Sequence, residues 1–428
     1  MGISSALYSG VSGLNTNGQA LSVIGNNLAN TNTLGFKGSR TVFSDLLSAS
    51  VMGSGGSSQV GRGVGMSRVD GIFSQGTFET TESSLDVAIE GDGFFILSPA
   101  TDDRMFYTRA GAFNFNEQGF LVSPEGYRVI GQPFNSDGNL VPGAPTDIQV
   151  QNLGLIAGEP TTEMTFTTNL DAAIEVPATV PIFDYTDTST YDFSSSSQVY
   201  DTLGNPKLIT TYYTKTSTNT WDVNWSATLE DGSTVTGPAT PLELAFTSNG
   251  VLADPSDPTI PATLPVTMSI GASELDWGNG SAPQDITVTF DTTQFYSDSG
   301  VISQEQNGFA AGELTGVDID DSGAVTASYS NGKTVAIANL SLAAFRNPNG
   351  LEAVGSNLFT ATATSGVPRV GLPGPELGKI YTNTLERSNV DMGAEFVSMI
   401  NFQRGFQANS KIITTVDDLL NELINLKR

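Results

Sequence analysis

One cluster of carboxylates superficially resembles a calcium-binding loop. Asp318, Asp320 and Asp321 lie within the segment 316–329. This segment lacks the regularly spaced ligands and the final bidentate Glu that an EF-hand loop requires. Solvated carboxylates on a β-turn are therefore the favoured interpretation, and no metal site is expected.

Two pairs of side chains have types that carbohydrate enzymes use. Asp102 and Asp103 could imitate the acid pair of a glycosidase. Chance pairs are inevitable in a chain with 45 Asp plus Glu, so a solvated acidic face explains this pair better. Trp221 and Trp225 fall on one face of a predicted strand and could form a platform for sugars, but burial in a domain core is favoured.

The glycine-rich segment 61–65 neither follows a strand nor precedes a helix, so no dinucleotide site is expected.

The composition removes two of the side chains most used in catalysis. Among its 428 residues the chain has no Cys and no His. It therefore has no thiolate nucleophile, no Cys-based zinc site and no imidazole for proton transfer or metal binding. We expect no enzyme activity, no catalytic residue, no cofactor and no small-molecule substrate.

Acidic charge is concentrated in the middle of the chain. The formal net charge is -27, but the first 70 residues carry four basic and two acidic side chains, and the last 50 carry six of each. An acidic exterior repels nucleic acid and anionic membranes, so neither is an expected partner. The nearly neutral ends lack this self-repulsion and could pack against other copies of the chain.

The sequence predicts an exported protein that does not insert into a membrane. No apolar run approaches the ~18 residues of a membrane-spanning helix. The first 21 residues lack the basic region and the compact apolar core of a cleaved signal peptide. Because the chain is rich in Ser, Thr, Gly and Asn and poor in Lys, we expect a dedicated export route without a cleaved signal.

The first thirty residues have the periodicity of a helix with one apolar seam. Apolar residues recur every seven positions, with two more on the neighbouring position of the same stripe, which is a coiled-coil-like pattern. This predicted N-terminal seam consists of Ile3, Leu7, Leu14, Leu21, Ile24 and Leu28. Gly10, Gly13, Gly18 and Gly25 interrupt the helix, each at a cost of up to ~1 kcal/mol. The helix should therefore need a partner to form.

The last forty residues predict a second, longer helix over 391–426, with Ser388 to Asp391 fitting a capping box at its start. The predicted C-terminal seam consists of Met392, Met399, Phe402, Phe406, Ile413, Val416, Leu420 and Leu423. The two seams could pack against each other within one chain or against other subunits. The interior glycines favour packing against other subunits, since such helices become ordered only when neighbours supply contacts.

Between the helices the pattern changes to strands, predicted at 207–214, 220–229, 286–291, 324–330 and 334–345. The stretches 53–65 and 365–378 are rich in Gly or Pro and are expected to be linkers, the first of them flexible. The predicted fold is mainly β, with nested discontinuous β-barrel or sandwich domains and terminal α-helices that form a coiled-coil-like inner assembly domain. The predicted parts are a terminal helical assembly domain (1–30 with 385–428), an extended connecting segment (31–70 with 364–384), an inner β domain (71–145 with 300–363) and an inserted outer β domain (146–299).

Four motifs, in order, resemble those of the flagellar rod and hook protein family. They are IGNNLANTNTLGFKGSR at 24–40, SQGTFETTESSLDVAIEGDGFF at 74–95, YTRAGAFNFNEQGFLV at 107–122 and the segment 385–428. The motif that follows the first helix contains Asn26, Asn27, Leu28, Ala29, Asn30, Thr31, Gly35 and Phe36. Within the family, the long inserted segment resembles the outer domain of the hook branch, and 199–225 carries that likeness. A distal rod protein is much shorter and remains the alternative within the family.

The resemblance implies a structural subunit of the bacterial flagellar hook. Such a subunit polymerises into a curved, flexible tube that acts as a universal joint between rod and filament. The implied partners are further copies of the chain, the distal rod protein, the hook cap protein, the hook-filament junction protein and the flagellar type III export apparatus. The implied location is extracellular, at the hook and basal body. Outside the family, an exported acidic β-rich adhesin and a secreted carbohydrate-active enzyme are the alternatives.

Overall fold

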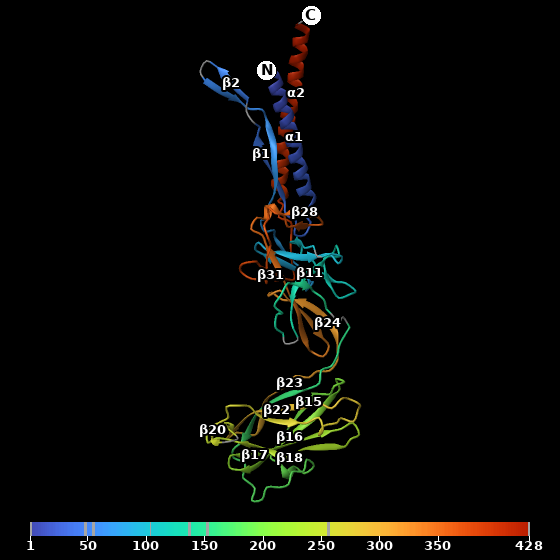
Figure 1. Ribbon diagram of the computed structural model, residues 1–428, viewed down its shortest axis with the longest axis vertical. Helices are drawn as coiled ribbons and strands as arrows, with labels where there is room; N and C mark the ends of the chain where they lie inside the picture. The colour runs from blue at the N-terminus through green and yellow to red at the C-terminus, as the bar shows by residue number, and fades with distance from the viewer. Residues whose placement is uncertain are drawn as a thin grey trace. The chain divides into compact units, whose positions relative to one another are not determined.

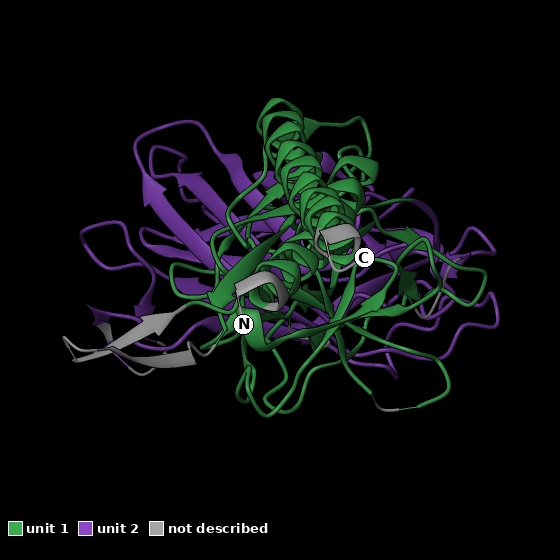
Figure 2. Cartoon of the chain, turned by 90° about the horizontal axis from the view of Figure 1, so that it is seen from above, with its two compact units in different colours: residues 1–151, 316–327, 334–428 green, residues 152–315, 328–333 purple. Residues whose placement is uncertain are grey.

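The computed structural model describes residues 2–46, 49–53, 56–102, 104–135, 138–150, 154–254 and 257–426 (Figure 1). They form two compact units (Figure 2). Unit 1 consists of residues 1–151, 316–327 and 334–428, and unit 2 of residues 152–315 and 328–333. Each unit is assembled from separate stretches of the chain. The finer division into four parts stays a prediction.

The two ends of the chain form long helices that pack against each other in unit 1. α1 spans Gly2–Ala29 and α2 spans Met392–Leu426, so both predicted helices are confirmed to within a residue or two. The helices are antiparallel, and both chain termini lie at the same end of the pair (Figure 1). The prediction of a capping box that begins at Ser388 is wrong, because α2 begins only at Met392. Asp391 caps α2 instead, because its Oδ1 accepts from the backbone N–H groups of Gly393 (2.8 Å) and Ala394 (3.1 Å).

Two hairpin-like pairs follow α1. β1 (Ser39–Asp45) pairs antiparallel with β4 (Val64–Gly71), and β2 (Ala49–Gly53) pairs antiparallel with β3 (Gly56–Val60). Strand residues therefore occur at 53, 56–60 and 64–65, where a linker was predicted, and the flexibility of this stretch stays a prediction. Strand pairing satisfies backbone groups that a linker would leave to water.

The rest of unit 1 is an irregular β domain that both halves of the chain build together. Its strands are β5 (Phe78–Thr80), β6 (Val87–Glu90), β7 (Phe94–Ser98), β8 (Phe106–Thr108), β9 (Asn114–Phe115), β10 (Leu121–Val122), β11 (Arg128–Pro133), β12 (Thr146–Asp147), β26 (Thr334–Leu340), β27 (Leu342–Ala344), β28 (Glu352–Gly355), β29 (Leu358–Thr360), β30 (Arg369–Gly371), β31 (Lys379–Thr382) and β32 (Thr384–Glu386). A short 3-10 helix spans Pro348–Gly350. β31 pairs with β6 and β32 pairs with β5, so the segment before α2 is tied to the segment that follows β4.

Unit 2 contains two four-stranded sheets around one core. Its strands are β13 (Leu155–Ile156), β14 (Glu163–Asp171), β15 (Phe193–Tyr200), β16 (Pro206–Ser217), β17 (Thr220–Thr228), β18 (Thr234–Ala245), β19 (Ala253–Asp254), β20 (Asp257–Pro261), β21 (Val266–Ile270), β22 (Ile286–Phe295) and β23 (Gly300–Gln306), with a 3-10 helix at Thr188–Thr190. The sheet orders are β21-β22-β14-β23 and β15-β16-β17-β18. β24 (Gly312–Ile319) and β25 (Ala324–Tyr329) run through the sequence boundaries between the units. Strands over all five predicted stretches are confirmed.

The core of unit 2 accounts for the two tryptophans of β17. Trp221 and Trp225 are both fully buried, together with Phe166 and Phe290, whose rings stack at 6.2 Å. Alternation of buried and exposed residues along β22 brings one face of that strand into the same core. The two indole rings are therefore core residues and do not present a sugar-binding platform.

Phe166→Ala is expected to destabilise unit 2 by about 3–5 kcal/mol, because it removes a fully buried ring and leaves a cavity. All three tryptophans of the chain (221, 225 and 277) lie in unit 2, so tryptophan fluorescence during urea unfolding reports on this unit alone. Tyr296→Ala is the control, since Tyr296 is 87% exposed, and it should leave the transition in place. Equal midpoints for Phe166→Ala and the parent would contradict the assigned core.

Candidate assembly surface

Small residues set the separation of α1 and α2. A Cβ atom built on Gly13 would lie 2.7 Å from the side chain of Asn409, and one built on Gly405 would lie 2.9 Å from Oδ1 of Asn17. At Gly10 the nearest atom would be Cγ1 of Ile413, at 3.2 Å. Glycine at these positions therefore allows the two helices to approach closely, which larger side chains would prevent.

The predicted N-terminal seam is only partly buried. Ile24 is 5% exposed, whereas Leu7, Leu14, Leu21 and Leu28 are half-buried, and the side chain of Ile3 lies outside the described residues. Besides Ile24, the buried line of α1 runs through smaller or polar residues, namely Gly10, Gly13, Thr16, Ala20 and Asn27. The leucines thus keep part of their apolar surface available to other molecules.

The predicted C-terminal seam divides into two groups. Phe402, Ile413 and Val416 pack within the chain: the Phe402 ring lies 5.7 Å from that of Phe43, Ile413 approaches Gly10, and Val416 is 6% exposed. Met399 is half-buried. Met392, Phe406 and Leu420 are 49%, 37% and 38% exposed, and the side chain of Leu423 lies outside the described residues. One heptad pattern therefore serves both internal packing and an exposed surface.

Many further large apolar side chains are exposed on the same elements. We name them, together with Met392, Phe406 and Leu420, the candidate assembly surface: Tyr8 and Val11 on α1; Phe43 on β1 and Leu46 just after it; Met66 and Val69 on β4 and Ile72 just after it; and Phe396, Val397, Ile400, Ile412, Leu419 and Ile424 on α2. Apolar exposure on this scale is typical of a protein–protein contact. The sequence analysis missed most of these residues because it considered one heptad seam per helix. The helical spacings of four residues between Phe396 and Ile400 and of seven between Ile412 and Leu419 were a visible signal of a second apolar stripe.

The motif after α1 forms a compact junction between the helices and the β domain. Asn27 is completely buried, and its Nδ2 donates to the carbonyl of Ser39 (2.7 Å) and to Oε1 of Glu395 (3.0 Å). Its Oδ1 accepts from the N–H of Ser39 at 2.9 Å. One amide side chain thus links α1, β1 and α2.

The other residues of this motif differ in burial and in role. Gly35 is buried and has φ of +64°, a left-handed conformation that glycine adopts without strain, and a Cβ there would lie 2.5 Å from the backbone nitrogen of Ala110. Leu28, Asn30, Thr31 and Phe36 are half-buried, and Asn26 and Ala29 are exposed. Asn27 and Gly35 therefore hold the junction together, while the remaining residues surround it.

Three buried charges that sequence reasoning missed lie at the same junction. Nζ of Lys37 is 2.6 Å from Oε1 of Glu386, and Nη1 of Arg109 is 3.6 Å from Oε2 of Glu386. All three side chains are at most 2% exposed. Burial lowers the pKa of Lys37 and of Arg109, and the Glu386 carboxylate opposes this shift in both. Each charge stands in a different motif (GFKG, YTRAG and LERSN), which is the one signal that could have pointed to them.

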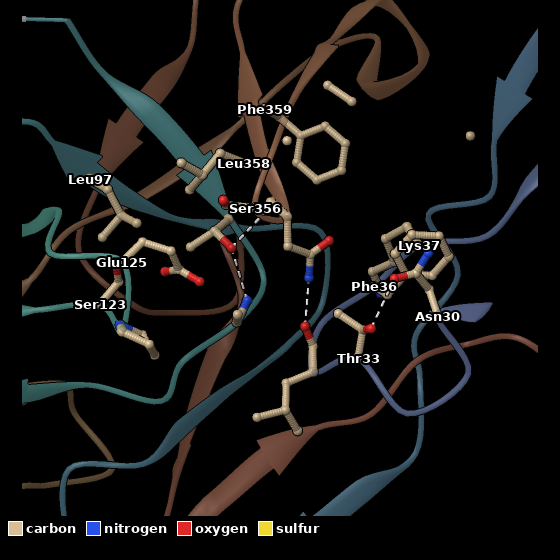
Figure 3. Close-up of a pocket in the computed structure, with 18 of the residues that line it drawn as sticks. Asn30, Thr33, Phe36, Lys37, Leu97, Ser123, Glu125, Ser356, Leu358 and Phe359 are labelled. Atoms are coloured by element: carbon tan, nitrogen blue, oxygen red, sulfur yellow. Dashed lines mark hydrogen bonds between the residues drawn. The ribbon is translucent and has the colours of Figure 1, made fainter. Parts of the chain in front are cut away.

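A cavity of about 550 Å³ lies beside this junction (Figure 3). Phe36, Leu97 and Phe359 contribute apolar lining, and Asn30 and Thr33 contribute polar groups, with Oγ1 of Thr33 donating to Oδ1 of Asn30 at 3.0 Å. No group of three or more His, Cys, Asp or Glu that could hold a metal occurs among the described residues.

The carboxylates considered from the sequence take part in local contacts. Oδ1 of Asp320 accepts from the N–H and hydroxyl of Ser322 and from the N–H of Ala324, which makes a turn. Asp102 pairs with Arg104 at 2.8 Å, and Asp103 lies outside the described residues. Among the described helices, none is long and apolar enough to cross a membrane.

Gly35→Ala is expected to destabilise the junction by about 2 kcal/mol or more. Alanine would be forced into a left-handed backbone conformation, and its Cβ would clash with backbone atoms. Trypsin should then cleave after Lys37, which is buried in the parent, at least about tenfold faster, as followed by mass spectrometry. Gly18→Ala is the control, because nothing lies within 4 Å of a Cβ there. Parental cleavage rates in Gly35→Ala would show that the junction does not depend on this backbone conformation.

Known protein families match the chain along most of its length. Family models match at 7–37 (flagella basal body rod protein), 88–180 (flagellar hook protein FlgE/F/G D1 domain), 169–309 (flagellar basal body protein FlaE D2 domain) and 382–426 (flagellar basal body rod FlgEFG protein C-terminal). The last match includes Glu386 and all of α2.

Individual relatives match over the whole chain. The flagellar hook protein FlgE of Escherichia coli K12 is 34% identical, over 99% of this chain and 100% of that protein. The flagellar hook protein FlgE of Borreliella burgdorferi is also 34% identical, over 99% of each chain. The crystal structure of the Helicobacter pylori flagellar hook protein FlgE2 covers 73% of this chain and 99% of that one, with a TM-score of 0.51 and 16% identity, and so supports the fold.

Proposed function

This chain belongs to the flagellar hook protein family and is a hook subunit, and we propose that it polymerises through α1, α2 and the β1–β4 pair. The observation that carries the proposal is the candidate assembly surface. Its apolar side chains remain exposed although α1 and α2 already pack against each other. Covering such side chains stabilises a contact by about 25 cal/mol per Å² of apolar area.

The distribution of charge supports the same elements as the contact region. The first 70 and last 50 residues are nearly neutral, whereas the excess of acidic residues lies between them. Neutral ends can come together in a crowded tube without strong mutual repulsion, and the acidic β regions can remain in solvent. A contact between two different patches of neighbouring copies extends into a helical tube when its rotation does not close into a ring, and this is the arrangement that we propose.

The proposed tube is a curved, flexible joint that passes torque from the rod to the filament, with no enzyme activity. Its further partners would be the distal rod protein, the hook cap protein, the hook-filament junction protein and the type III export apparatus. Its location would be extracellular, reached without a cleaved signal peptide. Family membership supports these assignments, and the absence of Cys and His from the sequence agrees with a structural role.

Electron microscopy of the purified full chain tests the proposal. Short, curved tubes are the expected result at high protein concentration. Straight tubes would favour a rod protein of the same family. Dispersed particles or thin unbranched fibres would contradict polymerisation into a hook and favour an exported adhesin.

A further inference from the structure

The carboxylate of Glu386 joins segments from both ends of the chain. Oε1 accepts from Nζ of Lys37 (2.6 Å) and from the N–H of Gly76 (2.8 Å), and Oε2 faces Arg109. The backbone carbonyl of Glu386 accepts from the N–H of Gly35 at 2.7 Å. Glu386 ends β32, six residues before α2 begins, and Lys37 lies eight residues after the end of α1. The side chain therefore connects the base of one terminal helix to the base of the other.

The buried charges around Glu386 balance only when the segment after α1 and the segment before α2 are both docked. Two cations share one carboxylate, and Asp92 is the further acidic group whose charge acts on Arg109. If the segment before α2 leaves, Lys37 and Arg109 lose the one carboxylate that faces both of them. If the segment after α1 leaves, the Glu386 carboxylate loses its closest cation. Breaking a buried ion pair is strongly unfavourable because the remaining charge stays out of water.

Neutral hydrogen bonds connect the same segments. The Asn389 side chain accepts from the N–H of Gly38 (2.8 Å) and donates to the carbonyl of Ile72 (2.7 Å). A half-docked chain that lost these bonds could recover them from water at a small net cost. A buried ion cannot be compensated in this way, so the ion network dominates the coupling.

We propose that Glu386 is a positioning residue that makes the two ends of the chain become ordered together. A subunit then presents either the complete helix pair or neither helix docked, and half-docked subunits are excluded from assembly. This inference rests on the proposed function, because the helix pair is the contact region of the proposed polymer.

Hydrogen exchange of the full-length chain, in the free subunit and in sedimented polymer, tests the coupling. Glu386→Gln keeps the shape of the side chain and removes its charge, while Lys37→Met keeps the apolar stem. Glu386→Gln should speed exchange of the amides at 27–39, on the far side of the junction, by about 100-fold or more. Lys37→Met should do the same at 384–394. If Glu386 and Lys37 act through the same interaction, the effects of the two substitutions are not additive. In both amide ranges the double variant Glu386→Gln/Lys37→Met should therefore exchange no faster than the faster single variant.

Glu79→Gln is the matched control, because Glu79 pairs with Arg387, the residue after β32, but is 56% exposed. It should leave exchange at 27–39 unchanged. Faster exchange at 384–394 alone in Glu386→Gln would overturn the proposal, as would a parent whose amides at 27–39 are unprotected in every state. Polymer formation by the parent is scored separately by sedimentation, so failure of the proposed function is distinguished from failure of the coupling.

Discussion

Phe406→Asp is expected to abolish polymerisation while both units keep their β structure. Phe406 lies near the middle of α2 and is 37% exposed, so its ring is available to a neighbouring subunit. Assembly covers only the exposed part of the ring, which is worth a fraction of the ~1.5–3 kcal/mol of a whole side chain, and a carboxylate buried in the contact adds a cost of several kcal/mol. Because about 1.4 kcal/mol changes an equilibrium constant tenfold, the critical concentration should rise roughly 1,000-fold or more.

Sedimentation of matched concentrations measures this effect, and tryptophan fluorescence and circular dichroism verify the fold. Gln407→Asp introduces the same charge on the next residue, an exposed polar position that projects from α2 in a direction about 100° away, and should change polymer mass little. Phe406→Leu retains an apolar side chain and should restore most of the polymer. A Phe406→Asp protein that polymerises like the parent would show that this part of α2 is not an assembly surface.

Asn27→Leu is expected to raise the critical concentration about 100-fold or more without removing any exposed contact. The Asn27 side chain is completely buried and satisfies both backbone groups of Ser39 and one oxygen of Glu395. Leucine is of similar size but leaves these three groups unpaired, at about 1–3 kcal/mol for each that stays buried. The helix pair would then be wrongly placed relative to β1, although the candidate assembly surface itself is unchanged.

Asn26→Leu is the control for this effect, since Asn26 is the preceding residue of the same helix and is exposed. Light scattering over a concentration series gives the critical concentration of both variants and of the parent. Similar values for Asn27→Leu and Asn26→Leu would mean that the junction does not determine how the helices are presented to neighbouring subunits.

Local patterns in the sequence determined which elements form. The apolar periodicity predicted both terminal helices to within a residue or two, because a helix is set by spacings of three and four residues along one segment. Alternation of apolar residues predicted β17 and β22 in the same way. Four ordered motifs indicated the flagellar rod and hook family, and relatives that match the whole chain confirm it.

Only the tertiary structure decided what each apolar side chain contacts. A heptad spacing is the same whether the partner is a helix of the same chain or of a neighbour, so periodicity did not separate buried Val416 from exposed Phe406. The close approach at Gly10 and Gly13 was also invisible, since interior glycine by itself only lowers helix stability.

The buried network of Lys37, Arg109 and Glu386 is the clearest case of information that the linear sequence lacks. Its members are 72 or more residues apart and meet because β5 pairs with β32 and β6 pairs with β31. A single charged residue in a sequence is normally solvated, and nothing in its neighbours along the chain indicates burial. Burial of these charges is set by long-range strand pairing, which only the folded chain defines.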